Sequence, residues 1–303
     1  MLRKLKIKWI KWIDWVNLDK ASIYEAVKKH DFHELDIEAC LEENQRTRID
    51  SYDDYIFMVL HFPKYNPRTK IYYLNEFNIF LWKDFLITLK NFWWIHFDDI
   101  FERYSKLDIE WNIDLKISSW YILYEIIQSI LEKMFRLTLN VKKDIKEIEK
   151  QVFDRESSTL VKDIMIKKRN IVVLKHMFKP QISVLKLLEH NVNKLFKWKM
   201  EVYFEDLEDK LEHIVSDINI LEEYIESVED AFKTIIDIKT NFIIKLLTIF
   251  SAFLLPLTLI TSFYGMNINL PFYDQPYFVY ILLVISVFIM LFIYIFFRKN
   301  WRF

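Results

Sequence analysis

Polar and small side chains recur at helical spacing near the carboxyl end of this chain. They are Asn241, Thr248, Ser251, Thr258, Ser262 and Gly265. Steps of seven, three and four residues keep side chains on one face of a helix. Ile244, Leu247 and Leu255 fall on or beside the same stripe. Such a face could line a wet conduit, although small and hydroxyl residues also join membrane helices to one another. The stripe alone leaves both interpretations open.

A tetrapeptide, Tyr264-Gly265-Met266-Asn267, ends this stripe. Gly265 is the one glycine of the whole sequence, so its use indicates a backbone requirement, either a positive φ or a close approach. The carboxyl end of a helix exposes carbonyl oxygens with partial negative charge, and Asn267 adds an amide oxygen. Several copies around an axis would form a ring of neutral oxygens suited to a hard cation.

The stripe lies in a long apolar segment. Lys245 and Asp274 are the only charged residues between positions 243 and 297. A helix needs about 20 apolar residues to cross the hydrocarbon core of a bilayer. We therefore expect two transmembrane helices, at about 243–266 and 276–297, rather than a pair of buried core helices.

Basic residues flank the two expected spans, whereas the loop between the spans has no Lys or Arg. The flanking residues are Lys239, Lys245, Arg298, Lys299 and Arg302. The positive-inside rule then places both termini in the cytoplasm and the loop outside. Because the first residues lack the apolar core of a signal peptide, we expect a multi-pass protein of the inner (cell) membrane.

The charged remainder of the chain predicts an α+β domain followed by long helices. Aromatic and β-branched residues predict strands near 4–9, 55–62, 77–82 and 85–89. Apolar periodicity predicts helices near 36–44, 119–153 and 159–192, and one helix from 203 to about 263. The expected divisions are a cytoplasmic α/β domain at 1–116, a helical hairpin at 117–200, a stalk helix at 201–242 and a transmembrane domain at 243–303.

Composition excludes several function classes. A P-loop, a dinucleotide-binding loop and a hydrolase nucleophile elbow each need at least two glycines, so we expect no enzyme of these kinds. One cysteine excludes an internal disulfide framework and a zinc cluster built on several cysteines. The formal net charge of −1 argues against a nucleic-acid partner. Two spans cannot enclose a pore, so a conducting path would need several subunits.

Several segments of the carboxyl-terminal half match one known pattern. They are Tyr203-Phe-Glu-Asp206, Asn241-x-x-x-Lys245, Pro256-Leu-Thr258, Tyr264-Gly-Met-Asn267 and Arg298-Lys-Asn-Trp301. With these motifs the chain resembles the CorA family of magnesium channels. The resemblance implies an α+β cytoplasmic domain followed by long helices and two C-terminal transmembrane helices, assembled as a funnel-shaped homopentamer. It also implies passive, membrane-potential-driven influx of Mg²⁺, with Co²⁺ and Ni²⁺ as further candidate ions.

The resemblance also implies roles for particular residues. The selectivity filter would be Gly265, Met266 and Asn267. The pore would be lined by Asn241, Ile244, Leu247, Ser251, Leu255, Thr258 and Ser262. Cytoplasmic Mg²⁺ would bridge acidic residues of neighbouring subunits, Asp206 with Glu38, and hold the pore shut. The family usually has acids where this chain has Ala39 and Gln128, so we expect weaker or displaced regulation.

Two other functions remain open at this stage. The first is transport of zinc or another divalent cation by the same superfamily, although the retained Met266 favours Mg²⁺. The second is a non-conducting membrane-anchored scaffold or sensor, which would need neither a polar face on the first span nor a lone glycine at its end.

Overall fold

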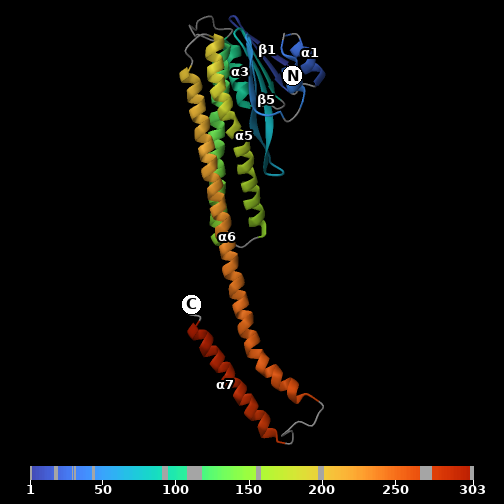
Figure 1. Cartoon of the computed structure of the whole chain (residues 1–303), viewed down its shortest axis with the longest axis vertical. Coiled ribbons are helices and arrows are strands. Elements are labelled where there is room, and N and C mark those ends of the chain that lie inside the picture. The colour runs from blue at the N-terminus through green and yellow to red at the C-terminus, as the bar shows by residue number, and fades with distance from the viewer. Residues whose placement is uncertain are drawn as a thin grey trace. The chain divides into compact units, whose positions relative to one another are not determined.

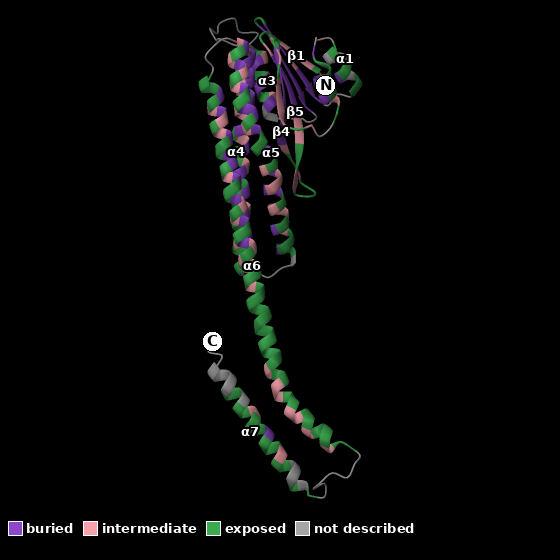
Figure 2. Ribbon diagram, in the orientation of Figure 1, coloured by how far each residue is buried: buried purple, intermediate pink, exposed green. Residues whose placement is uncertain are grey.

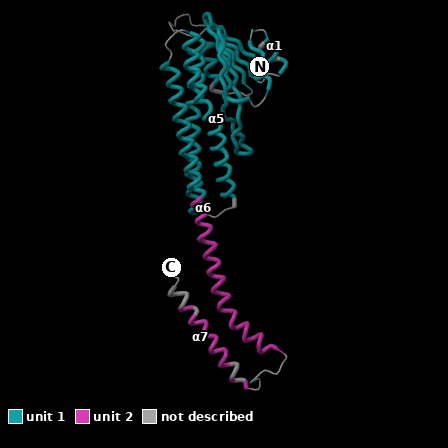
Figure 3. Tube along the Cα trace, in the orientation of Figure 1, with its two compact units in different colours: residues 1–229 teal, residues 230–303 magenta. Residues whose placement is uncertain are grey.

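The computed structural model divides the chain into two compact units, Met1–Glu229 and Asp230–Phe303 (Figure 3). The residues that the structure describes are 2–16, 20–28, 30, 32–42, 45–90, 95–107, 118–154, 158–196, 201–266 and 275–300. The expected filter residue Asn267 and the loop acid Asp274 lie outside these ranges.

The first unit is built on a single six-stranded sheet (Figure 1). Its strands are β1 (Leu2–Ile7), β2 (Ile10–Val16), β3 (Arg48–Ser51), β4 (Tyr55–Asn66), β5 (Ile71–Trp82) and β6 (Phe85–Lys90). They lie in the order β1-β2-β6-β5-β4-β3. Every neighbouring pair is antiparallel except β2 and β6, which run parallel.

Two short helices, α1 (Lys20–Lys28) and α2 (Glu34–Leu41), pack on one face of the sheet. The buried cluster on this face consists of Trp15, Ile23, Phe32, Ala39, Cys40, Tyr55, Phe57, Val59, Phe80, Ile87 and Leu89. Burial raises the pKa of the Cys40 thiol, so this side chain is a packed and unreactive residue.

The opposite face of the sheet is covered by α3 (Ile95–Leu107), α4 (Ser119–Asp154) and α5 (Ser158–Phe196). Trp12 of β2 contacts the rings of Phe97, Phe101 and Tyr104 of α3. Polar contacts fix α5 to the sheet: the side-chain amide of Gln181 donates to the His61 carbonyl oxygen at 2.8 Å. The sheet is therefore the middle layer of three.

Helix α6 (Glu201–Tyr264) begins in the first unit and packs there against α4 and α5. Its buried side chains recur every three or four residues from Phe204 to Val228. Ion pairs border this seam, with Lys186 Nζ 2.7 Å from Glu208 and Lys168 Nζ 2.9 Å from Glu229. The buried pattern ends where the second unit begins, although the helix itself continues to Tyr264.

The second unit contains the rest of α6 and α7 (Pro276–Asn300). Within the described residues, α6 is the one helix long and apolar enough to cross a membrane, and its apolar window is 0% buried in this chain. A core helix of a soluble protein would be mostly buried, so the exposure of this window favours the expected transmembrane helix over a core helix. In α7 the apolar stretch is shorter, Tyr280–Phe292.

The structure confirms most of the expected elements and adds four that the sequence patterns missed: β2, β3, α1 and α3. The strand expected at 4–9 covers the second half of β1 and also the turn of the hairpin that follows it. Lys8 in this hairpin has a φ of 53°, a left-handed conformation that glycine or asparagine usually occupies. Because neither residue is present, the turn left no sequence signal. The helix expected at 36–44 is α2, which ends at Leu41.

Candidate functional site

The expected pore stripe lies on an exposed face of α6. The part of α6 that lies in the second unit is mostly exposed (Figure 2). Its exposed residues include Asn241, Ile244, Leu247, Ser251, Leu255, Thr258 and Ser262. Leu247 and Leu255 are 65% and 66% exposed, which is unusual for leucine in a folded chain. The half-buried residues of this part of α6 form a second set: Ile249, Ala252, Phe253, Pro256, Leu257, Ile260 and Tyr264.

These two sets lie on opposite sides of the helix. Each residue advances about 100° around an α-helix of 3.6 residues per turn. At that rotation, the stripe residues centre on one direction and the half-buried residues centre roughly 180° away. The structure therefore leaves the polar stripe uncovered by the described parts of this chain and turns the purely apolar side away from it.

Threonine hydroxyls on α6 are anchored to its own backbone. Thr248 Oγ1 donates to the Ile244 carbonyl oxygen at 2.8 Å, and Thr258 Oγ1 donates to that of Leu254 at 2.9 Å. A hydroxyl that donates a hydrogen bond in this way still has lone pairs that can accept hydrogen bonds. Each threonine therefore presents an oxygen that can accept from the waters around a cation.

Gly265 follows the last residue of α6. Its N–H donates to the Thr261 carbonyl oxygen at 2.9 Å, and a Cβ added here would lie 3.0 Å from the same oxygen. Its φ is not positive. Of the two backbone reasons that the sequence left open, close approach is confirmed and left-handed geometry is wrong. Met266 is 49% exposed beyond it.

Asp206 lies in the first unit, on the second turn of α6. Its side chain is 43% exposed and its Oδ2 atom lies 2.6 Å from Lys210 Nζ. Tyr124 Oη of α4 donates to the same oxygen at 3.3 Å. Partial burial, followed by the charge of Asp206, raises the pKa of Tyr124 to about 12. The carboxylate is therefore stabilised without a metal but remains accessible.

Glu38 lies on α2 and is exposed, whereas its neighbour Ala39 is buried in the sheet core. Asp36, in the same helix, is buried and accepts a 2.8 Å hydrogen bond from Tyr55 Oη. In the described part of the chain no hydrogen bond or ion pair joins Glu38 to Asp206, and no group of three or more His, Cys, Asp or Glu is placed to bind a metal.

Two residues of this region escaped the sequence patterns. Lys210 was detectable, because a basic residue four positions after an acid commonly pairs with it on a helix. Tyr124 was not, since 82 residues separate it from Asp206 along the chain.

An α+β domain followed by a long helix with an exposed apolar and polar-striped end is typical of a membrane-anchored protein. A family model, described as "CorA-like Mg2+ transporter protein", matches residues 8–299. The chain belongs to this family.

Curated relatives and a solved structure agree with this assignment. The cobalt/magnesium transport protein CorA of Thermotoga maritima is 27% identical over 237 residues, which span 78% of this chain and 66% of that protein. The protein of the same name from Methanocaldococcus jannaschii is 24% identical over 285 residues, 92% of this chain and 87% of that one. The complete structure of the CorA magnesium transporter from M. jannaschii superimposes with a TM-score of 0.80 at 22% identity, covering 97% of this chain and 92% of that one. This last likeness establishes the fold.

Proposed function

We propose that this protein mediates passive, membrane-potential-driven influx of Mg²⁺ through a homo-oligomeric channel, with Co²⁺ and Ni²⁺ as further candidate ions. The observation that carries the proposal is the exposed stripe of oxygens and aliphatic side chains from Asn241 to Ser262, on the side of α6 opposite its half-buried face. Together with the membership of the chain in a transporter family, this face favours an ion path over helix packing in a scaffold.

A pore requires several copies, because one α6 presents only one wall. The family resemblance supports five copies, with α6 inside and α7 as an outer second span at about 276–297. The basic residues that follow this span support cytoplasmic termini. The filter in this arrangement is the Gly265, Met266 and Asn267 segment at the outer mouth.

The stripe suits an ion that keeps its water. Mg²⁺ dehydrates reluctantly, so a ring of neutral acceptors can hold its hydration shell without stripping it. Ser251 and Thr258 supply hydroxyl oxygens, and Leu247 and Leu255 supply apolar constrictions between them. The stripe from Asn241 to Ser262 carries no carboxylate that would trap the ion.

The membrane potential supplies the driving force. One elementary charge moving through 100 mV gains about 2.3 kcal/mol, so a divalent ion gains roughly twice that. No nucleotide is needed, in agreement with the absence of a P-loop from the sequence.

Flux into proteoliposomes tests this proposal. With a Mg²⁺-sensitive dye inside, we expect Mg²⁺ entry that rises with an imposed inside-negative potential and is reduced by external Co²⁺ or Ni²⁺. Protein-free liposomes under the same potential are the control. Zn²⁺ flux under a proton gradient, without Mg²⁺ entry, would replace the proposal with zinc transport. No flux of any divalent ion from assembled protein would leave a scaffold.

Gating by cytoplasmic Mg²⁺ is a second part of the proposal. An ion held between Asp206 of one copy and Glu38 of its neighbour would keep the copies together and the pore closed; both side chains are accessible on the monomer. Lys210 competes with that ion, because its ammonium already lies 2.6 Å from Asp206. Ala39, where the family usually has an acid, is buried and uncharged. We propose that closure therefore needs a higher Mg²⁺ concentration than it would with an acid at position 39 as well.

Lys210→Met should therefore make closure more sensitive to internal Mg²⁺. An exposed ion pair of this spacing is worth about 0.3–0.5 kcal/mol, so the Mg²⁺ concentration for half-closure should fall about twofold. Asp206→Ala removes one ligand of the ion and should raise the Mg²⁺ concentration for half-closure about tenfold, which corresponds to about 1.4 kcal/mol. Lys175→Met is the matched control, because it removes an ion pair with Glu222 that is remote from Asp206 in the sequence. It should leave the Mg²⁺ concentration for half-closure unchanged. Equal closure in all four proteins would eliminate Asp206 as a regulatory ligand.

A further inference from the structure

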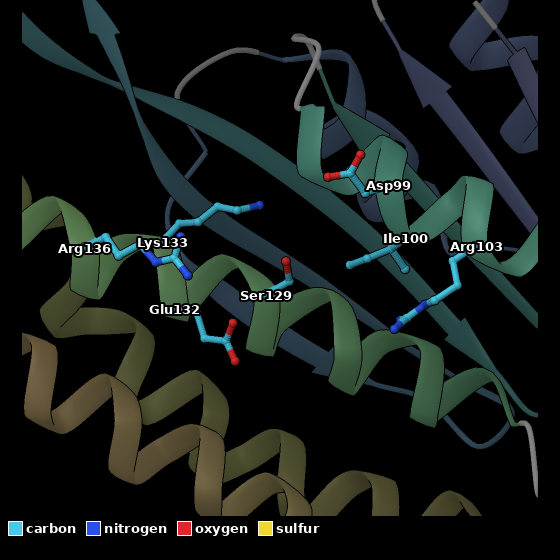
Figure 4. A pocket seen from close by; sticks show the side chains of 7 residues that line it. All are labelled: Asp99, Ile100, Arg103, Ser129, Glu132, Lys133 and Arg136. Atoms are coloured by element: carbon cyan, nitrogen blue, oxygen red, sulfur yellow. The ribbon is translucent and has the colours of Figure 1, made fainter.

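A cavity of about 300 Å³ lies between α3 and α4 of the first unit (Figure 4). Its polar lining consists of Asp99 and Arg103 from α3, and Ser129, Glu132, Lys133 and Arg136 from α4. Figure 4 shows Lys133 and Arg136 toward one end of the cavity and Arg103 toward the other. The volume lies at the lower limit of small-molecule sites, which span about 300–1,000 Å³.

The three cations of this cavity differ in their partners. Arg103 is neutralised, because its Nη2 atom lies 2.9 Å from Glu125 Oε2. Lys133 and Arg136 form no ion pair with any residue that the structure describes. They are three residues apart on α4, so their side chains leave the same side of the helix. Two adjacent positive charges therefore face one cavity without forming an ion pair, although the carboxylates of Asp99 and Glu132 line the same cavity.

This arrangement is unfavourable for the protein alone. Partial burial of the Lys133 ammonium, together with the nearby charge of Arg136, lowers the pKa of Lys133 to about 8. Lys90 and Lys186, by contrast, have acidic partners: Lys90 lies 3.4 Å from Asp14, and Lys186 lies 2.7 Å from Glu208. A bound anion would give Lys133 and Arg136 the negatively charged partner that Lys90 and Lys186 have within the chain.

We propose that this cavity binds a phosphate group, held by Lys133 and Arg136 with the Ser129 hydroxyl as a further donor. Arginine matches two phosphate oxygens at once, and lysine adds a compact charge. Asp99 and Glu132 line the same cavity and would repel an extended polyanion, so the ligand is inorganic phosphate or a small phosphate ester. This site is independent of the ion path and would persist if the transport proposal failed.

Calorimetric titration of the full-length protein in zwitterionic nanodiscs tests the site. Inorganic phosphate and glycerol 3-phosphate, both without Mg²⁺, are the two probes. We expect saturable binding that weakens about tenfold in Lys133→Met and in Arg136→Gln, because hydrogen bonds to charged groups are strong. Lys133→Arg keeps the charge and should restore binding. Tighter binding of glycerol 3-phosphate than of phosphate would identify a phosphate ester as the ligand, and the reverse would identify free phosphate.

An exposed lysine on the same helix provides the matched control. Lys142→Met removes a cation of α4 that does not line the cavity, and it should bind both probes like the unmodified protein. Unchanged melting temperatures would show that the variants fold. Absence of saturable binding, or equal loss of binding in Lys142→Met and Lys133→Met, would overturn the proposal.

Discussion

Positively charged, membrane-impermeant thiol reagents should block Mg²⁺ entry after Ser251→Cys or Thr258→Cys, but not after Ile249→Cys or Leu257→Cys. The first two positions lie on the exposed stripe, whereas the other two lie on the half-buried opposite side of α6. If the stripe lines a water-filled path, a charged adduct there both obstructs it and repels divalent cations. We expect most of the flux to be lost.

The native chain is a suitable background for this measurement. Its one cysteine, Cys40, is buried in the sheet core, and burial raises the pKa of its thiol, so the reagent should leave the unmodified protein active. The alternative that the stripe only packs helices together makes the opposite forecast. In that case Ser251→Cys and Thr258→Cys would be as unreactive as Ile249→Cys, and the pore assignment would be wrong.

Gly265→Ala should reduce Mg²⁺ entry about tenfold, since forcing one extra carbon into a tight contact costs about 1–3 kcal/mol. The new Cβ would lie 3.0 Å from the Thr261 carbonyl oxygen. A shift of the helix end that relieves this contact would also lengthen the hydrogen bond that the Gly265 N–H donates to the same oxygen at 2.9 Å. The φ of Gly265 is not positive, so alanine suffers no backbone penalty and the effect isolates the close approach.

Ile260→Val is the matched control for this substitution. It alters a residue on the half-buried side of α6 and adds no atom, so the mouth of the pathway should keep its geometry. Both variants should be compared at equal oligomer content, measured by size-exclusion chromatography with light scattering. Full flux in assembled Gly265→Ala protein would show that the glycine has no role in conduction.

Local patterns in the sequence were sufficient for the features that depend on neighbouring residues. The apolar run, the spacing from Asn241 to Ser262 and the unbroken helix from the stalk into the membrane segment all follow from side chains within a few turns of one another. The Lys210–Asp206 pair was missed at this level, although four-residue spacing permits it. The single glycine indicated a backbone requirement, but the sequence did not distinguish a positive φ from a close approach.

The tertiary structure decided what depends on residues far apart in the chain. It paired β2 with β6 in parallel, and a hydrogen bond from Tyr124 fixed Asp206. It also placed Lys133 and Arg136 at a cavity beside α3. Above all, it determined which side of α6 is half-covered and which is open. Periodicity can place residues on a common face, but burial of that face depends on packing against other segments, which no local pattern contains.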